Sequence, residues 1–338
     1  MLGLICNPAA GKDVRRLVAT TPVVTNEAKA GLLARVLVGA RAAGETRALY
    51  LPDPWGLVER AAELAGVDIR LEAVAHPATG TWADTVAAAA AFRDAGVGVV
   101  VTLGGDGTNR AVALAWPNAL LLPIGAGTNN ALPLVVDGTA AGLAAGALAT
   151  GRIGRPEAAR QRPLVRVVVA GQDADDLAVV DAVLLRPGPV GARALYEPTA
   201  LRLAVVAGPD PTATGLAGIA GLCCPQARRD DAVLLRFDGD SPVLRRVVAL
   251  APGLTAVVGL AEARVLTPGE RVSGAGPGLL AFDGERERAV PSGATVSFTV
   301  DPDGPWIVEL DRALRAAVVA GVLDPDPALP ARRRTSSS

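Results

Sequence analysis

Apolar residues in the first 150 positions form short runs that alternate with helix-like patterns. Runs at 2–6, 48–51, 97–103 and 119–123 have the length of single strands, and 68–74 alternates between polar and apolar residues. The run at 97–103 is continuous and rich in valine, which is typical of a strand buried on both faces of a parallel sheet. Strands that alternate with helices in this way predict a doubly wound α/β sheet.

Helix start signals stand between these strands. Thr25 precedes Leu33 and Leu37, which have helical spacing, and Gly44 follows as a stop signal. Pro54 opens a second helical pattern that extends to residue 64. Thr81 begins a capping pattern, Thr-Trp-Ala-Asp, ahead of an alanine-rich segment that ends near residue 95.

The pattern changes after about residue 150. Short strand-like runs occur at 164–170, 178–185, 201–206, 232–237, 247–251, 279–282 and 295–300, separated by turns rich in Gly, Pro and Asp. Helical pattern returns only at 307–322. We therefore expect an α/β domain over 1–150, an all-β, sandwich-like domain over 151–310, a C-terminal helix over 311–323 and a disordered tail over 324–338.

Composition narrows the function classes. The 338 residues carry 33 Lys and Arg against 34 Asp and Glu, a net charge of −1, so there is no electrostatic case for nucleic acid or an anionic membrane as partner. Three cysteines and one histidine, His76, supply neither a disulfide framework nor a zinc site, and a cytoplasmic location is expected. Aromatic residues make up only 3%, so the core must be built from Ala, Val and Leu, and we expect His76, Trp82 and Trp116 to be packing residues.

The strongest chemical signal is Gly-Gly-Asp-Gly-Thr at 104–108, directly after the run at 97–103. Gly104, Gly105 and Gly107 let backbone N–H groups approach a phosphate, and a helix that begins near Thr108 adds its positive end. Asp106 suits this place if a divalent metal lies between the carboxylate and the phosphate, or if the carboxylate deprotonates a hydroxyl.

Two other loops are expected beside this one. About twenty residues on, Gly125 and Gly127 can line a nucleotide, and Thr128, Asn129 and Asn130 offer hydrogen-bond partners. Because one helix and one strand fit in that interval, both loops should emerge at the same edge of the sheet. A third wall is expected from the loop that contains Asn7 and Lys12, although this loop does not match a Walker A motif.

Three residues in the second half stand out. Asp181 lies within an apolar run, and an acid in a buried strand must be paired or functional. Thr214 belongs to the polar loop 209–215, which either contacts a substrate or merely connects two elements. Asp283 is part of a Phe-Asp-Gly-Glu segment that favours a hairpin turn.

The sequence as a whole resembles the NAD kinase and diacylglycerol kinase superfamily. The resemblance rests first on Gly-Gly-Asp-Gly-Thr at 104–108, a motif that these kinases share. The superfamily's other landmarks are matched, in the right order, by Asn7-Pro8 with Gly11-Lys12, Gly125 with Thr128-Asn129, and Asp283-Gly284-Glu285. The resemblance covers about residues 2–310. The stretches at 7–16, 127–131 and 214–221 look most like the ATP-NAD kinase-like proteins that include acetoin-catabolism protein X.

This resemblance implies an α/β nucleotide domain, a β-sandwich-like second domain and a cleft between them. It implies transfer of the γ-phosphoryl group of ATP, with Mg²⁺, to a hydroxyl, which in NAD kinases is the 2′-hydroxyl of NAD. Asp106 is then the catalytic residue, Asp106 and Asp283 are the metal candidates, and Asp181 and Thr214 face the acceptor.

Departures from the family pattern keep other functions open. Val180-Asp181 stands where NAD kinases carry an Asn-Glu pair that holds the acceptor, and Thr128-Asn129-Asn130 stands where lipid kinases show Gly-Asn-Asp. The alternatives are a non-catalytic nucleotide-binding accessory protein and a lipid kinase. The sequence also leaves homo-oligomerisation open.

Overall fold

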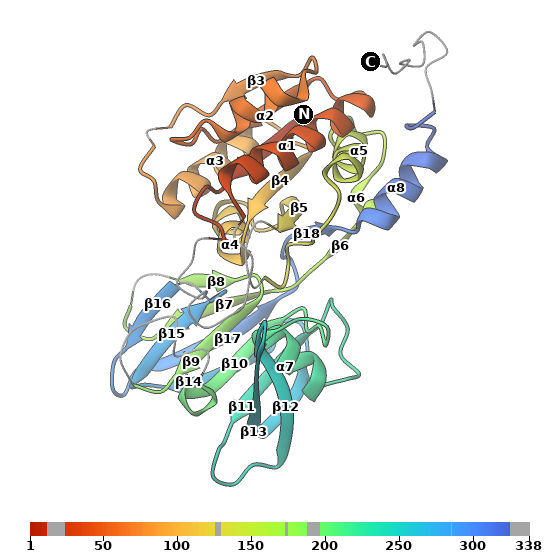
Figure 1. The fold of residues 1–338 in the computed structure, drawn as a ribbon. Coiled ribbons are helices and arrows are strands. Elements are labelled where there is room, and N and C mark those ends of the chain that lie inside the picture. Colours follow the sequence, from red (N-terminus) through yellow and green to blue (C-terminus); the bar gives the residue numbers. More distant parts are fainter. Residues whose placement is uncertain are drawn as a thin grey trace.

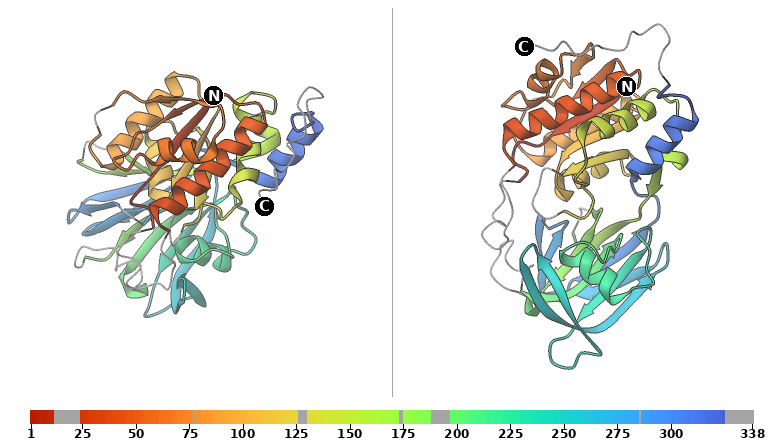
Figure 2. Two further views of the ribbon diagram at one scale, coloured as in Figure 1. Left: turned by 45° about the horizontal axis from the view of Figure 1, so that its top comes forward. Right: turned by 45° about the vertical axis from the view of Figure 1, so that its right-hand side comes forward.

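The computed structural model describes residues 1–11, 24–76, 78–125, 130–172, 175–187, 197–284 and 286–324. An α/β part lies above a β-rich part in Figure 1. The views in Figure 2 show the same division, with most helices in one part and most strands in the other.

A seven-stranded sheet forms the centre of the α/β part. Its strands, in spatial order, are β3 (Arg70–Ala73), β2 (Arg47–Tyr50), β1 (Leu2–Cys6), β4 (Val99–Gly104), β5 (Leu120–Gly125), β18 (Trp306–Val308) and β6 (Ala159–Gln161). All neighbours pair in parallel except β18 and β6, which are antiparallel. Every residue of β1 and β4 is buried, as the apolar runs predict.

Helices cover both faces of this sheet. On one face pack α1 (Asn26–Ala42), α2 (Leu57–Ala65), α5 (Gly138–Ala149) and α8 (Leu310–Val319), and on the other α3 (Trp82–Asp94) and α4 (Asp106–Ala115). The one-turn helix α6 (Arg155–Ala158) leads into β6. Thr25 and Thr81 cap α1 and α3 by accepting hydrogen bonds from Ala28 N and Ala83 N, as predicted. The doubly wound α/β architecture is thereby confirmed.

Glycines bring α1 and α5 unusually close together. A Cβ on Gly39 would lie 2.2 Å from the carbonyl oxygen of Thr139, and one on Gly142 would lie 2.1 Å from that of Val36. The two helix backbones therefore touch, and larger residues at either glycine would force them apart.

The β-rich part consists of two antiparallel sheets. One has the order β12 (Leu244–Ala251), β13 (Leu254–Leu266), β11 (Ala232–Phe237), β10 (Leu201–Ala207), β9 (Asp181–Leu185), β15 (Gly278–Phe282) and β16 (Arg286–Val290). The other has the order β14 (Arg271–Ala275), β17 (Thr295–Asp301), β7 (Leu164–Val169) and β8 (Asp176–Ala178). Their inner faces share one apolar core that includes Val167, Val205 and Phe298, which confirms the predicted sandwich-like second domain.

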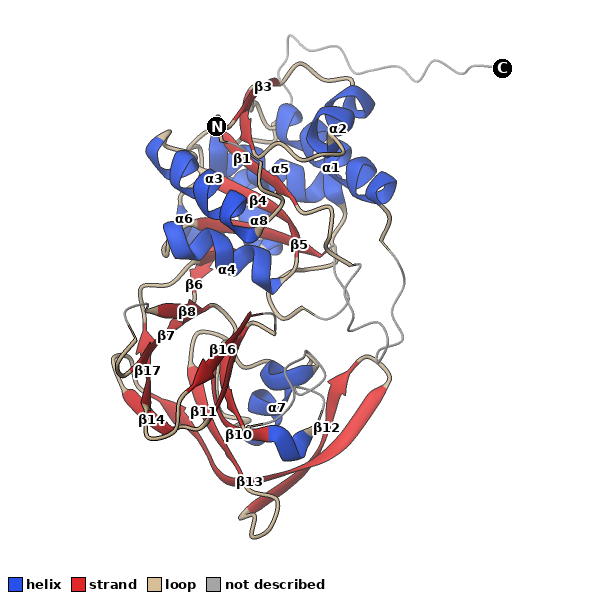
Figure 3. Ribbon diagram, turned by 90° about the vertical axis from the view of Figure 1, so that its left-hand side faces the viewer, coloured by secondary structure: helices blue, strands red, loops and turns tan. Residues whose placement is uncertain are grey.

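Three differences from the sequence-based elements bear on the second part and the C-terminal segment. A helix, α7 (Gly215–Cys223), packs on β12 where only loop and strand patterns were expected, and Figure 3 shows it beside the strands of the lower part. The run at 178–185 is divided between β8 and β9. The segment 307–322 is not a single helix, because Trp306–Val308 is a strand and α8 begins at Leu310.

The two parts are joined by more than one connection. Strands β6 and β18 fall within the range 151–310, yet both complete the first sheet. One apolar core also extends from α3 and α4 into the second part, with Val112 and Trp116 in the same cluster as Val179 and Ile219. Over the described ranges, no helix has both the length and the apolar character needed to span a bilayer.

Candidate functional site

Three polar loops leave the first sheet at one edge. Cys6 at the end of β1 pairs with Leu103 of β4, and Gly104 at the end of β4 pairs with Gly125 at the end of β5. The loops after β1, β4 and β5 therefore emerge side by side, as the spacing of the motifs predicts. Lys12, Gly127, Thr128 and Asn129 of the predicted set lie outside the described residues.

The Gly-Gly-Asp-Gly-Thr segment at 104–108, which we call the glycine loop, leads directly into α4. Gly105 is the N-cap and the helix begins at Asp106, slightly earlier than expected. A Cβ on Gly104 would lie 2.5 Å from Thr108 Oγ1, so only glycine fits there without a shift of Thr108. Buried Asn109 fixes the turn, since its Nδ2 donates to the Gly105 carbonyl at 3.0 Å and its Oδ1 accepts from Thr102 Oγ1 at 2.7 Å. The first N–H groups of α4 are thereby held at the sheet edge.

Asp106 links this loop to the one after β5. Its Oδ2 accepts a hydrogen bond from Ala131 N at 2.9 Å, and its Oδ1 accepts one from Leu132 N at 3.0 Å. Its own N–H donates to Asn130 Oδ1 at 3.4 Å. With 9% of its surface exposed, Asp106 holds two loops together and still reaches the surface.

The loop after β1 is bound to the same turn. Asn7 Nδ2 donates to Thr108 Oγ1 at 3.0 Å, and Asn7 Oδ1 accepts from Ala9 N at 2.9 Å. Beneath this loop, the fully buried Lys29 donates from Nζ to the carbonyl oxygens of Asn7 (3.0 Å) and Pro8 (2.9 Å). Sequence reasoning missed Lys29, although a lysine four residues before Leu33, on the apolar face of α1, was the available signal.

A cleft of about 460 Å³ opens beside the glycine loop. Its lining comes from the ends of β1 and β2 and the start of α3, and it includes Asp53, Trp55, Trp82, Gly107 and Thr108. Two of the four tryptophans of the chain line this cleft, Trp55 with 59% and Trp82 with 53% of its surface exposed. The expectation that Trp82 is a packing residue is therefore wrong, whereas Trp116, 8% exposed, does pack in the core.

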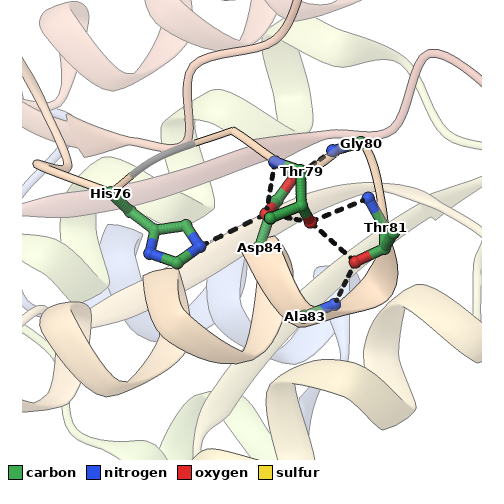
Figure 4. Close-up of polar contacts among 6 residues, drawn as sticks. All are labelled: His76, Thr79, Gly80, Thr81, Ala83 and Asp84. Atoms are coloured by element: carbon green, nitrogen blue, oxygen red, sulfur yellow. Dashed lines mark hydrogen bonds and ion pairs between the residues drawn. The ribbon is translucent and has the colours of Figure 1, made fainter.

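A hydrogen-bonded hub forms the rim of the cleft at the start of α3 (Figure 4). Asp84 accepts hydrogen bonds from Thr79 N, Thr79 Oγ1 and Gly80 N, and lies 3.2 Å from His76 Nε2. Burial raises the pKa of Asp84, but the hydrogen bonds from Thr79, Gly80 and His76 outweigh burial and lower that pKa below its usual value. His76 thus helps to shape the rim.

Asp283 occupies the turn between β15 and β16, where both Asp283 (φ 50°) and Gly284 (φ 73°) have left-handed backbone angles. The predicted hairpin is present, and it has a second role. The fully buried carboxylate accepts hydrogen bonds from Val179 N (3.0 Å), Val180 N (2.7 Å) and Asp181 N (3.0 Å). Burial and the nearby charge of Asp181 raise the pKa of Asp283 well above its usual value.

The two acceptor candidates lie on different elements of the second part. Half-buried Asp181 begins β9, and its carbonyl oxygen accepts from Asp283 N at 2.9 Å. Thr214 is the N-cap of α7, and the preceding loop packs against the glycines of that helix. Hydrogen bonds bring Asn7 to Thr108, Asp106 to Asn130 and Asp181 to Asp283.

In the described part of the chain, carboxylates do not gather into a metal-binding cluster at this edge. Among the residues that the structure describes, no group of three His, Cys, Asp or Glu side chains is placed to hold a metal ion. Asp283 does not fit a metal ligand, because its carboxylate is sealed and taken up by backbone N–H groups. Asp106 is the better candidate for a hydrated ion, because it lies in the first turn of α4 and keeps 9% of its surface exposed.

The fold and this edge define a two-domain protein with a glycine-lined cleft at the carboxyl end of a doubly wound sheet. The chain belongs to the acetoin catabolism protein X family. It is 36% identical over 315 residues to acetoin catabolism protein X of Cupriavidus necator, covering 89% of this chain and 87% of that protein. Residues 163–303 match the family model described as the acetoin catabolism protein X C-terminal domain.

Two kinases are among the solved structures that match this chain. Yeast NADH kinase in complex with NADH matches with a TM-score of 0.45 and 12% identity, covering 97% of this chain and 89% of that one. A diacylglycerol kinase from Bacillus anthracis matches with a TM-score of 0.41 and 11% identity, covering 91% and 96%.

Proposed function

We propose that this chain is a Mg²⁺-dependent ATP phosphotransferase that acts on a hydroxyl of a small molecule, with the 2′-hydroxyl of NAD as the favoured acceptor. The observation that carries the proposal is the cleft, which has exposed indole rings on its rim and a glycine-flanked helix N-terminus in its lining. This is the distribution of groups that a nucleoside triphosphate requires.

The cleft suits ATP along its length. Trp55 and Trp82 offer flat apolar surfaces on which a purine base can stack. Gly104, Gly105 and Gly107 are the proposed phosphate-binding glycines around the start of α4, and of these Gly107 lines the cleft. The proposed phosphate-binding set also includes Asn7, Thr108, Gly125 and Asn130. Its other proposed members lie outside the described residues: Lys12, Gly127, Thr128 and Asn129.

Asp106 is the residue that we assign to magnesium. Two backbone N–H donors and the helix N-terminus stabilise its ionised form, which suits a carboxylate that holds a hydrated cation through water. Magnesium bound there would neutralise charge on the phosphates during transfer. Asp181 is the acceptor-side candidate, because a half-buried carboxylate can accept hydrogen bonds from ribose hydroxyls.

The reaction exchanges one P–O bond for another. The acceptor oxygen forms a bond to the γ-phosphorus, the bond from that phosphorus to the β,γ-bridging oxygen breaks, ADP leaves, and the proton of the acceptor hydroxyl is released to solvent. The protein contributes mainly by positioning the two substrates, which is where most of the acceleration of phosphoryl transfer originates.

The test is formation of NADP from purified protein, ATP, Mg²⁺ and NAD. Asp106→Asn should lower the rate at least about 100-fold while ATP still binds. Asp137→Asn is the matched control, because Asp137 also accepts two backbone hydrogen bonds but caps α5. Normal turnover in Asp106→Asn would overturn the assignment.

A second candidate function is a nucleotide-binding protein without catalysis. It is favoured by the engagement of both Asp106 oxygens with backbone N–H groups, because such a carboxylate already has a structural task. ATP binding by folded wild-type protein with no product from NAD, or from diacylglycerol in vesicles, would select this function.

A further inference from the structure

Arg110 connects the helix of the glycine loop to the second part of the molecule. It lies one turn after Asp106 on α4, and its side chain is only 6% exposed. Nε donates a hydrogen bond to the carbonyl oxygen of Leu177 at 2.6 Å, and Nη2 pairs with the carboxylate of Asp176. Both partners belong to β8, so this contact joins the two parts of the molecule.

The hairpin that contains Asp283 meets the same guanidinium. Arg110 Nε lies 4.0 Å from Asp283 Oδ2, and the guanidinium carbon lies 5.2 Å from the centre of the Phe282 ring. Asp283 in turn holds the backbone N–H groups of residues 179–181, where β9 begins. A short chain of contacts therefore extends from the glycine loop through Arg110 and Asp283 to Asp181.

The chemistry of this contact demands arginine. The guanidinium donates to the Leu177 carbonyl oxygen and pairs with the buried Asp176 carboxylate. It also lies near the Asp283 carboxylate and faces the Phe282 ring. A planar fork can satisfy these partners together, whereas a lysine ammonium is a single point charge. Because buried ion pairs depend on good geometry, the second part can sit against α4 in only a narrow range of positions.

We propose that Arg110 is a positioning residue, which fixes the acceptor-side wall at Asp181 relative to the nucleotide loop at Asp106. The inference rests on the proposed function. ATP binds to groups of the first part alone, so the loss of Arg110 should leave ATP binding intact. Transfer requires both walls in register, and small displacements of reacting groups cost large factors in rate.

The test compares Arg110→Lys with wild type for ATP affinity and for kcat and KM toward NAD. We expect an ATP Kd within about threefold of wild type and a loss of kcat/KM for NAD of about 100-fold. Asp176→Asn breaks the same contact from the other side and should act in the same direction, which covers the case in which Arg110→Lys does not fold. Arg166→Lys is the control, because Arg166 pairs with Asp301 at 2.6 Å on a more exposed surface of the second part.

Two results would overturn the positioning role. One is a parallel loss of ATP affinity and transfer, which indicates a general structural effect, and the other is unchanged kcat/KM in folded Arg110→Lys and Asp176→Asn. If wild type forms no NADP, the proposed function fails, and hydrogen exchange at the amides of residues 179–181 decides instead. ATP should slow that exchange in wild type and not in Arg110→Lys, and an equal response in both would refute the link.

Discussion

The two sides of the proposed site use the same device for different ends. On the first part, Asp106 accepts hydrogen bonds from the successive backbone N–H groups of Ala131 and Leu132. On the second part, Asp283 accepts them from residues 179–181. In each case a carboxylate beside glycine fixes a distant loop by satisfying consecutive backbone donors.

The surroundings of the two carboxylates differ. Asp106 lies at a helix N-terminus in the glycine loop and keeps some exposure, whereas Asp283 is sealed beneath Arg110 and its pKa is raised by burial and by Asp181. An Asp-Gly pair therefore does not by itself indicate a metal ligand. A carboxylate can bind a metal ion only if the ion can reach it, and of these two carboxylates we expect this only of Asp106.

Removal of the sealed carboxylate should have the largest effect. Asp283→Ala leaves three buried N–H groups without an acceptor and deprives Arg110 of a nearby negative charge, so we expect a loss of about 3–5 kcal/mol in the free energy of unfolding. Urea unfolding measures this. Asp283→Asn, which tolerates the left-handed backbone better than alanine, should lose less. A loss below about 1 kcal/mol for alanine would show that these hydrogen bonds contribute little.

Asp106→Asn should destabilise the fold less. The amide keeps one acceptor oxygen but directs an NH₂ group at the second backbone N–H, which costs about 1–3 kcal/mol. Amide hydrogen exchange at Ala131 and Leu132 should accelerate. Asp137→Asn should change neither stability nor exchange at those amides, because asparagine is as good an N-cap as aspartate. Unchanged exchange at both amides in Asp106→Asn would show that the Asp106 carboxylate does not stabilise the loop after β5.

Much of the first part could be predicted from local patterns. Buried strands, the threonine caps and the shared edge of the glycine loops follow from apolar runs and spacing, and the structure confirms them. These features depend on neighbours in the sequence. Strands β6 and β18 depend instead on pairing between residues far apart in the chain, which periodicity cannot reveal.

The remaining site contacts depend on three-dimensional arrangement. The spacing in α1 indicates that Lys29 is buried but not that it supports the loop after β1, and nothing local indicates that Arg110 meets Asp176. Helix α7 was missed because its three glycines, at 215, 218 and 221, favour turns in isolation. A Cβ on Gly218 would lie 2.2 Å from the Ala213 carbonyl oxygen, so tertiary packing of the loop explains that glycine.

The two exposed tryptophans of the cleft test the open side of the proposed site, in contrast to the buried Asp283. Trp55→Ala or Trp82→Ala should weaken ATP binding by about 1–2 kcal/mol, roughly 5- to 30-fold in Kd, through lost base stacking. Calorimetric titration measures this without relying on tryptophan fluorescence. Trp306→Phe, in β18 and outside the cleft lining, should leave the affinity unchanged. Inorganic triphosphate should bind all these variants equally, and a parallel loss for triphosphate would exclude base stacking as the cause.

Asp84 is a third carboxylate that accepts hydrogen bonds from backbone N–H groups, and its loss should have the smallest effect on stability. It lies at the rim of the cleft and serves the backbone N–H groups of Thr79 and Gly80. Because its pKa is lowered in the folded state, its ionised form stabilises the protein above the unfolded-state pKa of about 3.9, and this contribution is lost as pH falls through the lower folded-state value. We expect Asp84→Asn to lose about 1 kcal/mol or less at pH 7, measured by urea unfolding.

The difference between wild type and Asp84→Asn should shrink as the pH is lowered below about 4, because the wild-type carboxyl then becomes protonated and resembles the amide. Thr81→Ala is a suitable control, since it removes a neighbouring cap of α3 that has no carboxyl group. Its cost should not depend on the ionisation of a side chain at residue 81. A constant difference for Asp84→Asn between pH 3 and pH 7 would mean that ionisation of Asp84 does not stabilise the rim, and that only the shape of its side chain matters there.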